Sequence, residues 1–450
     1  MKRFPIPRLE RYRTHRRERG VTMMFIVIAI FALLGVAALA IDLVTIYVSK
    51  AEAQRVADSA ALAGAKALVD AGITADPTNA SATWAASCTR ATDLAQGIAN
   101  RGLIGGTAPA TTTVCFTDGV SACSASCPAP GAAGSGFGVN PQVGVTVQSA
   151  TLPLFFAKIW GQKTATVSAV SNAEGFNPSG TTVPVQVGCV TPWLLPNINP
   201  VGGAIIDTAT GNIATPGTGP TGIFGNDIQL IVACMPSNCG NASRLLPSGN
   251  PPPIPPPTLP ATLSYYPLNL GTPAASRPSC AGGFAYSQNI TSCNRTSFQC
   301  GSTIPLAGLN PETSGTNIAS IECLTNAGAS GPGAGQDTLT TAVFPFTIQA
   351  GFENPLVALG TVATGDTIST SRSVVTLPIY NQGPAPPPPY PVPPNPAVVI
   401  GFAQAFVKEV SAGGQPMIRI LNVSGCAPGA TGAAVGDDQS SSVPVRLIHP

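Results

Sequence analysis

One uninterrupted apolar run near the N-terminus constrains this chain more than any other feature. Val21–Ile41 contains 21 residues without a charged side chain. As a helix it would span about 30 Å, which is the thickness of bilayer hydrocarbon. Because Leu43–Val48 continues the apolar pattern, we expect a transmembrane helix over residues 21–48. A carboxylate is costly at the bilayer centre, so we expect Asp42 near the outer interface and Tyr47 in the headgroup region.

The charge distribution predicts how this helix is oriented. Residues 1–20 hold eight Lys or Arg against Glu10 and Glu18, whereas the rest of the chain holds 14 basic and 18 acidic groups. Cytoplasmic flanks of membrane helices carry the positive excess, so 1–20 should be a cytoplasmic tip and the body should lie outside. A cleaved secretory signal is the alternative, since Ala38-Leu39-Ala40 offers a cleavage site. The run is longer, however, than the roughly 7–15 residues usual in such signals.

Composition argues against two broad classes of protein. Only 9% of the residues are charged, whereas the surface of a soluble cytosolic domain is about a quarter Asp, Glu, Lys and Arg. The formal net charge is only +2, and the basic residues do not spread along a reading face. We therefore expect no nucleic-acid partner.

All twelve cysteines lie beyond the apolar run. In an exported body this even number predicts up to six disulfides. A zinc site is the weaker alternative, because there is no C-x-x-C and the only histidines are His15 and His449. Connectivity does not follow from the sequence; a Cys234–Cys239 bridge and pairing within Cys280–Cys323 are our expectations. The candidate disulfide residues are Cys88, Cys115, Cys123, Cys127, Cys189, Cys234, Cys239, Cys280, Cys293, Cys300, Cys323 and Cys426.

The helix is expected to continue beyond the membrane as a stem. Residues 48–69 are rich in alanine and contain no Gly or Pro before Gly64, which favours helix. Small side chains recur on one face and allow another helix to approach closely. That partner is either this chain's own second helix or a second copy of the chain, giving a homo-oligomer. The stripe consists of Ala53, Ala57, Ala60, Ala61, Gly64 and Ala67.

Residues 49–175 are predicted to form a helical stem and a small α+β domain. A second helix is expected over 83–101, followed by a cysteine-stapled loop over 105–138. Alternating side chains then predict strands over 142–150 and 164–172. Strands packed on two long helices give a two-layer domain.

Residues 183–450 are predicted to form a β-rich, disulfide-stapled domain. Short β-branched runs are separated by Gly, Pro and Asn. A hairpin is expected from 398–410 and 417–423. Proline-rich insertions at 250–260 and 383–396 predict polyproline II stretches, which are either spacers or ligands for an aromatic groove. The overall fold class is therefore α+β, with an N-terminal transmembrane helix.

No motif in the chain supplies an active site. There is no G-x-S-x-G, and His449 is the only histidine available as a base outside the membrane. Gly161–Thr164 lacks the frame of a P-loop. Asp437-Asp438 lies in a Gly- and Ser-rich turn, and the fit of residues 438–442 to a D-x-S-x-S cation site is treated as coincidence. We assign no catalytic, cofactor-binding or metal-ligating residue, and we expect no cofactor.

The N-terminal stretch resembles TadE/TadG-like proteins of the Tad (Flp) pilus system. The matching features are Arg19-Gly20 before the apolar run, Ile41-Asp42-Leu43 at its end, then Tyr47, Gln54 and the run 57–65, which includes Asp58 and Gly64. A later stretch, 152–170, is similar to part of TadG-like proteins. The resemblance implies an inner-membrane protein whose periplasmic domain serves pilus assembly or anchoring.

One position separates the subgroups of that family. Prepilin-like members carry a Glu five residues after the cleavage glycine, whereas this chain has Phe25 five residues after Gly20. The resemblance therefore favours the larger TadG-like type over a processed pseudopilin.

We consider three functions. The first is a non-enzymatic, membrane-anchored structural protein of pilus assembly, whose partners are the lipid bilayer and other pilus or envelope proteins. The second is a cell-surface adhesin or carbohydrate-binding protein that uses the β-rich body. The third is an exported hydrolase, which the absence of a catalytic motif disfavours.

Overall fold

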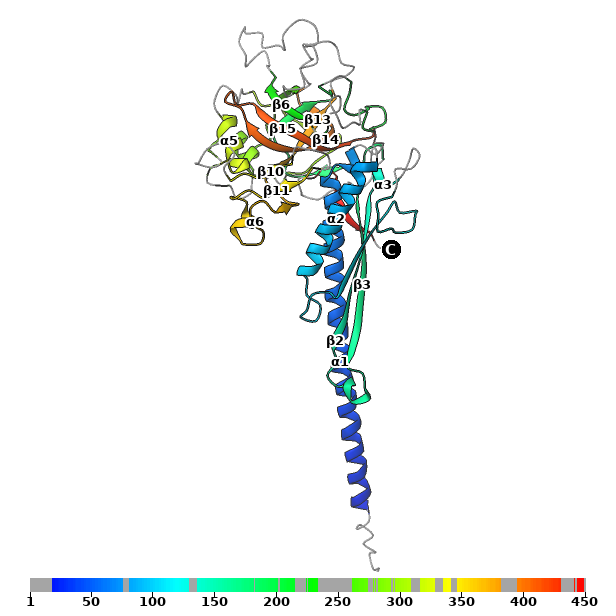
Figure 1. The fold of residues 1–450 in the computed structure, drawn as a ribbon. Coiled ribbons are helices and arrows are strands. Elements are labelled where there is room, and N and C mark those ends of the chain that lie inside the picture. The colour runs from blue at the N-terminus through cyan, green and yellow to red at the C-terminus, as the bar shows by residue number, and fades with distance from the viewer. Residues whose placement is uncertain are drawn as a thin grey trace, which may run out of the picture.

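The computed structural model describes the chain from the apolar helix to the last strand (Figure 1). The described residues are 18–75, 81–128, 136–181, 183–200, 203–214, 224, 226–233, 261–273, 278, 280, 282–292, 294, 296–308, 316–327, 335–340, 346–381, 395–429, 441 and 443–448. Outside them lie residues 1–17, 250–260, 383–394, Asp437, Asp438, Cys234, Cys239 and Cys293, and with these the expected Cys234–Cys239 bridge.

A single helix, α1 (Glu18–Asp70), runs through 53 residues, a length of about 80 Å. Nearly all side chains between Val21 and Val48 are exposed. Beyond Val48 one face of the helix is buried in the folded body (Figure 1). Among the described residues, α1 is the one helix that is long and apolar enough to cross a membrane.

The second half of α1 packs on α2 (Ser81–Arg101) and on an antiparallel sheet. The sheet has the order β1 (Thr111–Thr117), β2 (Gln142–Pro153), β3 (Thr164–Gly175) and β16 (Val445–Ile448). The alternation in β2 buries Val143, Val145 and Val147 against the helices, while the intervening residues face outward. We call this body of helices and sheet the stem.

The segment between α2 and β2 is more ordered than the sequence indicates. Instead of a plain loop it contains strand β1, paired with β2 from Thr111 to Thr117, and the four-residue helix α3 (Gly136–Val139). Cys115–Cys123 closes the turn after β1, and Cys88–Cys127 ties the segment to α2. The strand escapes sequence analysis because its threonine-rich pattern resembles that of the surrounding loop.

Strand β16 brings the chain back from the β-rich domain to the stem. It pairs with β3 from Asn172 to Gly175. The half-exposed Arg446 forms an ion pair with the buried carboxylate of Glu174 at 2.6 Å and lies 4.4 Å from the ring centre of Phe176. Whereas the sequence pattern assigns all of 183–450 to the β-rich domain, the structure places 445–448 in the stem sheet.

The β-rich domain is a closed barrel with mixed strand directions, which we call the head. Its strands follow the order β13 (Val374–Tyr380), β5 (Trp193–Pro196), β7 (Ala261–Pro267), β6 (Asp227–Val232), β15 (Pro416–Gly425) and β14 (Ala397–Val410). Because β14 also pairs with β13, the sheet closes and leaves no long free edge. The β14–β15 pair is the hairpin that the sequence predicts, and the predicted α+β class is confirmed.

Large apolar side chains fill the barrel, and two short helices cover it. The indole N–H of Trp193 donates to the hydroxyl of Tyr286 on α4 (Ala285–Thr291) at 3.0 Å. That hydroxyl meets Asn317 on α5 (Thr316–Thr325), whose amide donates to the Tyr265 hydroxyl at 2.8 Å. The polar tips of Trp193, Tyr286 and Tyr265 are thus paired inside the head.

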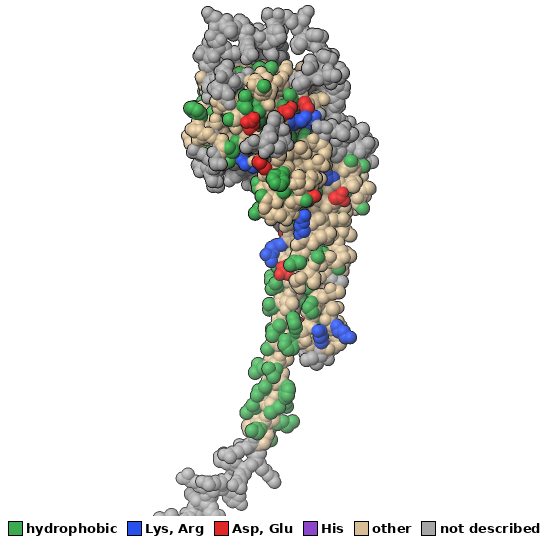
Figure 2. All heavy atoms as spheres, turned by 60° about the vertical axis from the view of Figure 1, so that its left-hand side comes forward, with side chains coloured by type: hydrophobic (Ala, Val, Ile, Leu, Met, Phe, Trp, Pro, Cys, Tyr) green, Lys and Arg blue, Asp and Glu red, His purple; other side chains and the backbone are tan. Residues whose placement is uncertain are grey.

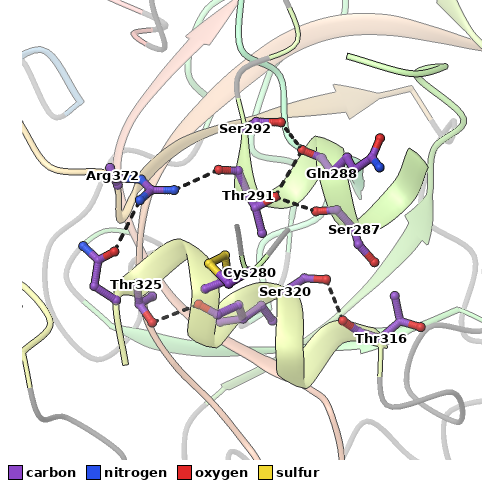
Figure 3. Close-up of a disulfide and its surroundings, with 12 residues drawn as sticks. Cys280, Ser287, Gln288, Thr291, Ser292, Thr316, Ser320, Thr325 and Arg372 are labelled. Atoms are coloured by element: carbon purple, nitrogen blue, oxygen red, sulfur yellow. Dashed lines mark hydrogen bonds between the residues drawn. A yellow bond between two sulfur atoms is a disulfide. The ribbon is translucent and has the colours of Figure 1, made fainter. Parts of the chain in front are cut away.

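A disulfide and an arginine hold α4 and α5 together (Figure 3). Cys280 pairs with Cys323 on α5. The guanidinium of Arg372 donates to the Thr291 carbonyl at 3.0 Å and to the Asn326 side chain at 3.3 Å. A cation at the C-terminal ends of both helices complements their dipoles.

The other cysteines of the head do not all pair locally. Cys300 leaves the 280–323 segment to pair with Cys426, across 126 residues of sequence. Cys189 is also disulfide-bonded, and no cysteine among the described residues is free. The expectation of pairing within Cys280–Cys323 therefore holds for its two end residues and not for Cys300.

Short elements complete the head. They are β4 (Gln186–Val187) with β8 (Phe298–Gln299), β9 (Thr303–Ile304) beside β14, and β10 (Thr338–Leu339), β11 (Ile348–Gln349) and β12 (Thr367–Ile368) in a small sheet next to α6 (Pro355–Ala358). The buried carboxylate of Asp337 orders this last region. It accepts hydrogen bonds from the Gly351 amide at 2.8 Å, the Asn354 amide group at 2.9 Å and the Ser371 hydroxyl at 2.5 Å.

We predict that the Cys300–Cys426 bridge stabilises the protein more than the Cys115–Cys123 bridge does. The first closes a sequence separation of 126 residues and the second one of 8. Loss of loop entropy in the unfolded chain gives about 5 kcal/mol for the long loop and about 2.5 kcal/mol for the short one. Urea unfolding of the Cys300→Ala/Cys426→Ala and Cys115→Ala/Cys123→Ala variants, followed by tryptophan emission, measures both. Equal losses would contradict the prediction.

Candidate functional site

The most distinctive polar group of α1 is Asp42, at the end of its bare apolar half. Its side chain is only 3% exposed. One carboxylate oxygen accepts from the Phe155 amide at 2.8 Å, and the other accepts from the amides of Phe156 at 3.0 Å and Ala157 at 2.7 Å. Hydrogen bonds from several donors offset the cost of burying a charge. Asp42 therefore attaches the β2–β3 connection to α1.

We call this connection, residues 153–163, the hairpin tip. The three amides lead into the short 3₁₀ helix η2 (Ala157–Trp160), so Asp42 acts as an N-cap supplied by a different helix. Gly161 adopts a left-handed φ of 85° and turns the chain back into β3. The sequence places Asp42 near an interface, whereas its three partners appear only when α1 and the hairpin are brought together.

Gln54 and Asp58 have a related role, more than three turns beyond Asp42 along α1. The Gln54 amide group donates to the Val170 carbonyl at 3.1 Å and to Asp58 at 2.8 Å. Lys50 donates to the Ser168 carbonyl. Strand β16 covers β3 from residue 172 onward, so these side chains satisfy the carbonyl groups of the edge that β16 leaves open.

Gly64 lets α1 approach both of its neighbours. A Cβ at this position would lie 3.0 Å from Val143 on β2 and 3.4 Å from Ala95 on α2. The alanines of the small-residue stripe are buried within this single chain. The sequence leaves open whether the stripe packs on this chain's own second helix or on a second copy of the chain. In the structure it packs on α2 and on the sheet of the same chain. The stripe is therefore covered and does not present a surface to a second copy.

Two further residues of the predicted motif have no intramolecular contact that explains them. Tyr47 is 76% exposed on α1. A Cβ on Gly20 would meet nothing within 4 Å.

A buried polar cluster joins the stem to the head. Asn422 on β15 donates to the Val69 carbonyl at the end of α1 and to Gln404 on β14, and accepts from the Thr74 hydroxyl at 3.0 Å. Thr74 lies in the short helix η1 (Ile73–Ala75). Asn177 bridges the two bodies again, donating to the carbonyls of Thr74 at 3.1 Å and Val423 at 3.2 Å.

Sequence analysis does not reveal this cluster. Asn422, Gln404, Thr74 and Asn177 are all nearly fully buried. The available signal is Asn422 within the otherwise apolar run of β15, since a buried strand position rarely carries an amide without a partner. The sequence alone does not reveal that the partner belongs to another domain.

A second contact between the bodies involves arginines. Arg90 on α2 donates to the Phe346 carbonyl at 2.6 Å, and the Arg419 guanidinium lies 5.3 Å from the centre of the Phe346 ring. Arg419 also pairs with Asp227 through two nitrogens, at 2.9 and 2.5 Å. Burial lowers the pKa of Arg90, while the nearby charge of Asp70 acts in the opposite direction.

The polar contacts described above hold parts of the chain together. Within the described parts of the chain, no three His, Cys, Asp or Glu side chains gather as metal ligands. Asp42, Asp337 and Asp227 are each occupied by hydrogen bonds or ion pairs within the chain. These three carboxylates connect one element of the chain to another.

We predict that Asp42→Ala releases the hairpin tip. Hydrogen bonds to a charged acceptor contribute about 1.5–3 kcal/mol each, so the amides of Phe155, Phe156 and Ala157 should exchange about tenfold to hundredfold faster. Hydrogen exchange of the full chain, resolved by mass spectrometry, measures this. The amides of Val145 and its neighbours provide the internal control, and unchanged protection at the tip would contradict the role of Asp42.

We predict that Asn422→Leu loosens the head on the stem. The substitution leaves the buried Thr74 hydroxyl without its acceptor and the buried Gln404 side-chain oxygen without its donor, at about 1–3 kcal/mol for each group. The amides of η1 and of Asn177 and Ser179 should lose protection, while those of the barrel interior keep it. Gln299→Leu, which changes an exposed amide side chain of the head, is the matched control. The same behaviour in both variants would contradict the prediction.

The comparisons with known proteins agree with the N-terminal geometry. The family model for Flp pilus-assembly TadE/G-like proteins matches residues 20–67. No curated protein and no solved structure matches the chain. The matched range lies wholly within α1 and includes Asp42, Gln54 and Gly64. Over this segment the chain is similar to Flp pilus-assembly TadE/G-like proteins.

Proposed function

We propose that this chain is a non-enzymatic membrane anchor that holds a folded head at a fixed height for assembly of a Flp pilus. The observation that carries the proposal is the continuity of α1. The segment that matches the TadE/G-like family lies wholly within α1. Its first part is exposed and apolar, and its last part is the central helix of a disulfide-bonded body.

The proposed location is the bacterial inner membrane, with the N-terminus in the cytoplasm. The basic excess of residues 1–20 supports this orientation. The disulfides of the stem and head support a body in the oxidising periplasm, because such bonds are rare in the cytosol.

The head is the part proposed to contact pilus or envelope partners. From Asp42 to Asp70, α1 rises by about 40 Å, and the buried cluster around Asn422 supports a fixed head–stem angle. The size of the head and Phe25 at the position of the prepilin glutamate favour the larger TadG-like type. A rigid spacer of this length would present the head to partners away from the lipid.

The proposal is tested by deleting the gene and restoring it as the full chain or as Asp42→Ala. We expect the deletion to lose surface pili in electron micrographs and the wild-type chain to restore them. Asp42→Ala should restore fewer pili at equal protein level, because the body is then less firmly fixed to its anchor. Normal piliation of the deletion strain would overturn the proposal.

A cross-linking experiment tests where partners bind and separates the adhesin alternative. Phe284, Phe352 and Leu359 are exposed apolar residues of the head, and Val120 is an exposed residue of the stem that serves as control. A photo-reactive residue at the head positions should capture pilus or envelope proteins, and at Val120 it should not. An adhesin would instead be cleaved by protease added to intact cells, which should spare a periplasmic body.

A further inference from the structure

The hairpin tip lies at the height where the apolar half of α1 ends. From Val21 to Asp42 the helix rises by about 30 Å, equal to the thickness of bilayer hydrocarbon. The hydrogen bonds from Phe155, Phe156 and Ala157 hold the tip directly against Asp42. A helix that crosses a membrane from Val21 therefore places the tip at the opposite surface.

The side chains of the tip suit a headgroup layer. Phe155 is 60% exposed although it is fully apolar, and Lys158 and Lys163 are exposed beside it. Residues 153–163 contain these two cations and no acidic residue. Aromatic rings and lysines are the residues that concentrate at membrane interfaces. Figure 2 shows basic side chains at the foot of the body, beside the point where the apolar helix leaves it.

We propose that the hairpin tip docks on the lipid leaflet that faces the body. Phe155 enters the boundary between headgroups and acyl chains, and Lys158 and Lys163 bind the phosphates of anionic phospholipids. The protein then meets the membrane at two places, through α1 and through the tip, and the stem is held at one tilt. This inference rests on the membrane crossing of the proposed function.

Tryptophan quenching in the full chain tests the proposal. The sequence has three tryptophans, and two of them, Trp84 and Trp193, are buried. The third is removed by the substitution Trp160→Phe. Phe155→Trp is added to this background, and the protein is placed in nanodiscs of phosphatidylethanolamine and phosphatidylglycerol with brominated acyl chains. We expect the added emission to shift to shorter wavelength and most of it to be lost to the bromine atoms.

Val120→Trp in the same background is the matched control. Val120 is 93% exposed and follows Thr117, which pairs with Gln142 at the other end of β2, about 35 Å from the tip. Its emission should not be quenched. Equal quenching at 155 and 120, or none at 155, would overturn the proposal. Gln162→Trp provides a second probe of the tip if Phe155→Trp fails to fold.

The lysines are tested separately, in the Phe155→Trp background. Lys158→Gln together with Lys163→Gln should reduce the quenching in nanodiscs that contain phosphatidylglycerol. Unchanged quenching would show that the phosphate contacts are wrong. Failure of the membrane crossing itself is distinguishable, because the protein would then not enter the nanodiscs at all.

Discussion

A single helix in this molecule has to be stable in two different surroundings. From Val21 to Ile41 the side chains of α1 are almost all exposed, whereas the second half of the helix contributes to the core of the stem. Backbone hydrogen bonds within the helix satisfy both halves, but the side chains change from large apolar ones to small ones where α1 enters the folded body. The elements of the stem pack along this axis, and Asp42 marks the point at which α1 first contacts the folded body.

Small side chains allow both α2 and the stem sheet to pack against the second half of α1. Alanines at 0% exposure let α2 approach on one side and the sheet on the other, and at Gly64 even a methyl group would meet Val143 at 3.0 Å. Close approach gives many weak dispersion contacts in place of a few large side chains. Polar residues between them, such as Gln54, are then free to satisfy the edge of β3.

The sequence predicts features that depend on one segment and misses those that depend on two. The long helix, α2 and the β14–β15 hairpin follow from local periodicity and composition. The partners of Asp42, the amide cluster at Asn422 and the return of β16 do not, because each joins residues more than a hundred positions apart. The pairing of β13 with β14 that closes the barrel is likewise not predicted. The alternation of apolar and polar side chains along a strand shows which face is buried, but it does not show which strand is the neighbour.

Because β16 returns to the stem sheet, the head is an insertion within the stem and not a separate domain that follows it. The chain enters the head after β3 and leaves it before β16, and these two strands lie side by side, with the Phe176 amide bonded to the Pro444 carbonyl. A domain held by one linker can swivel about single bonds, whereas two adjacent covalent crossings resist torsion. A pull on the head is therefore shared between two backbones and loads the β3–β16 ladder in shear.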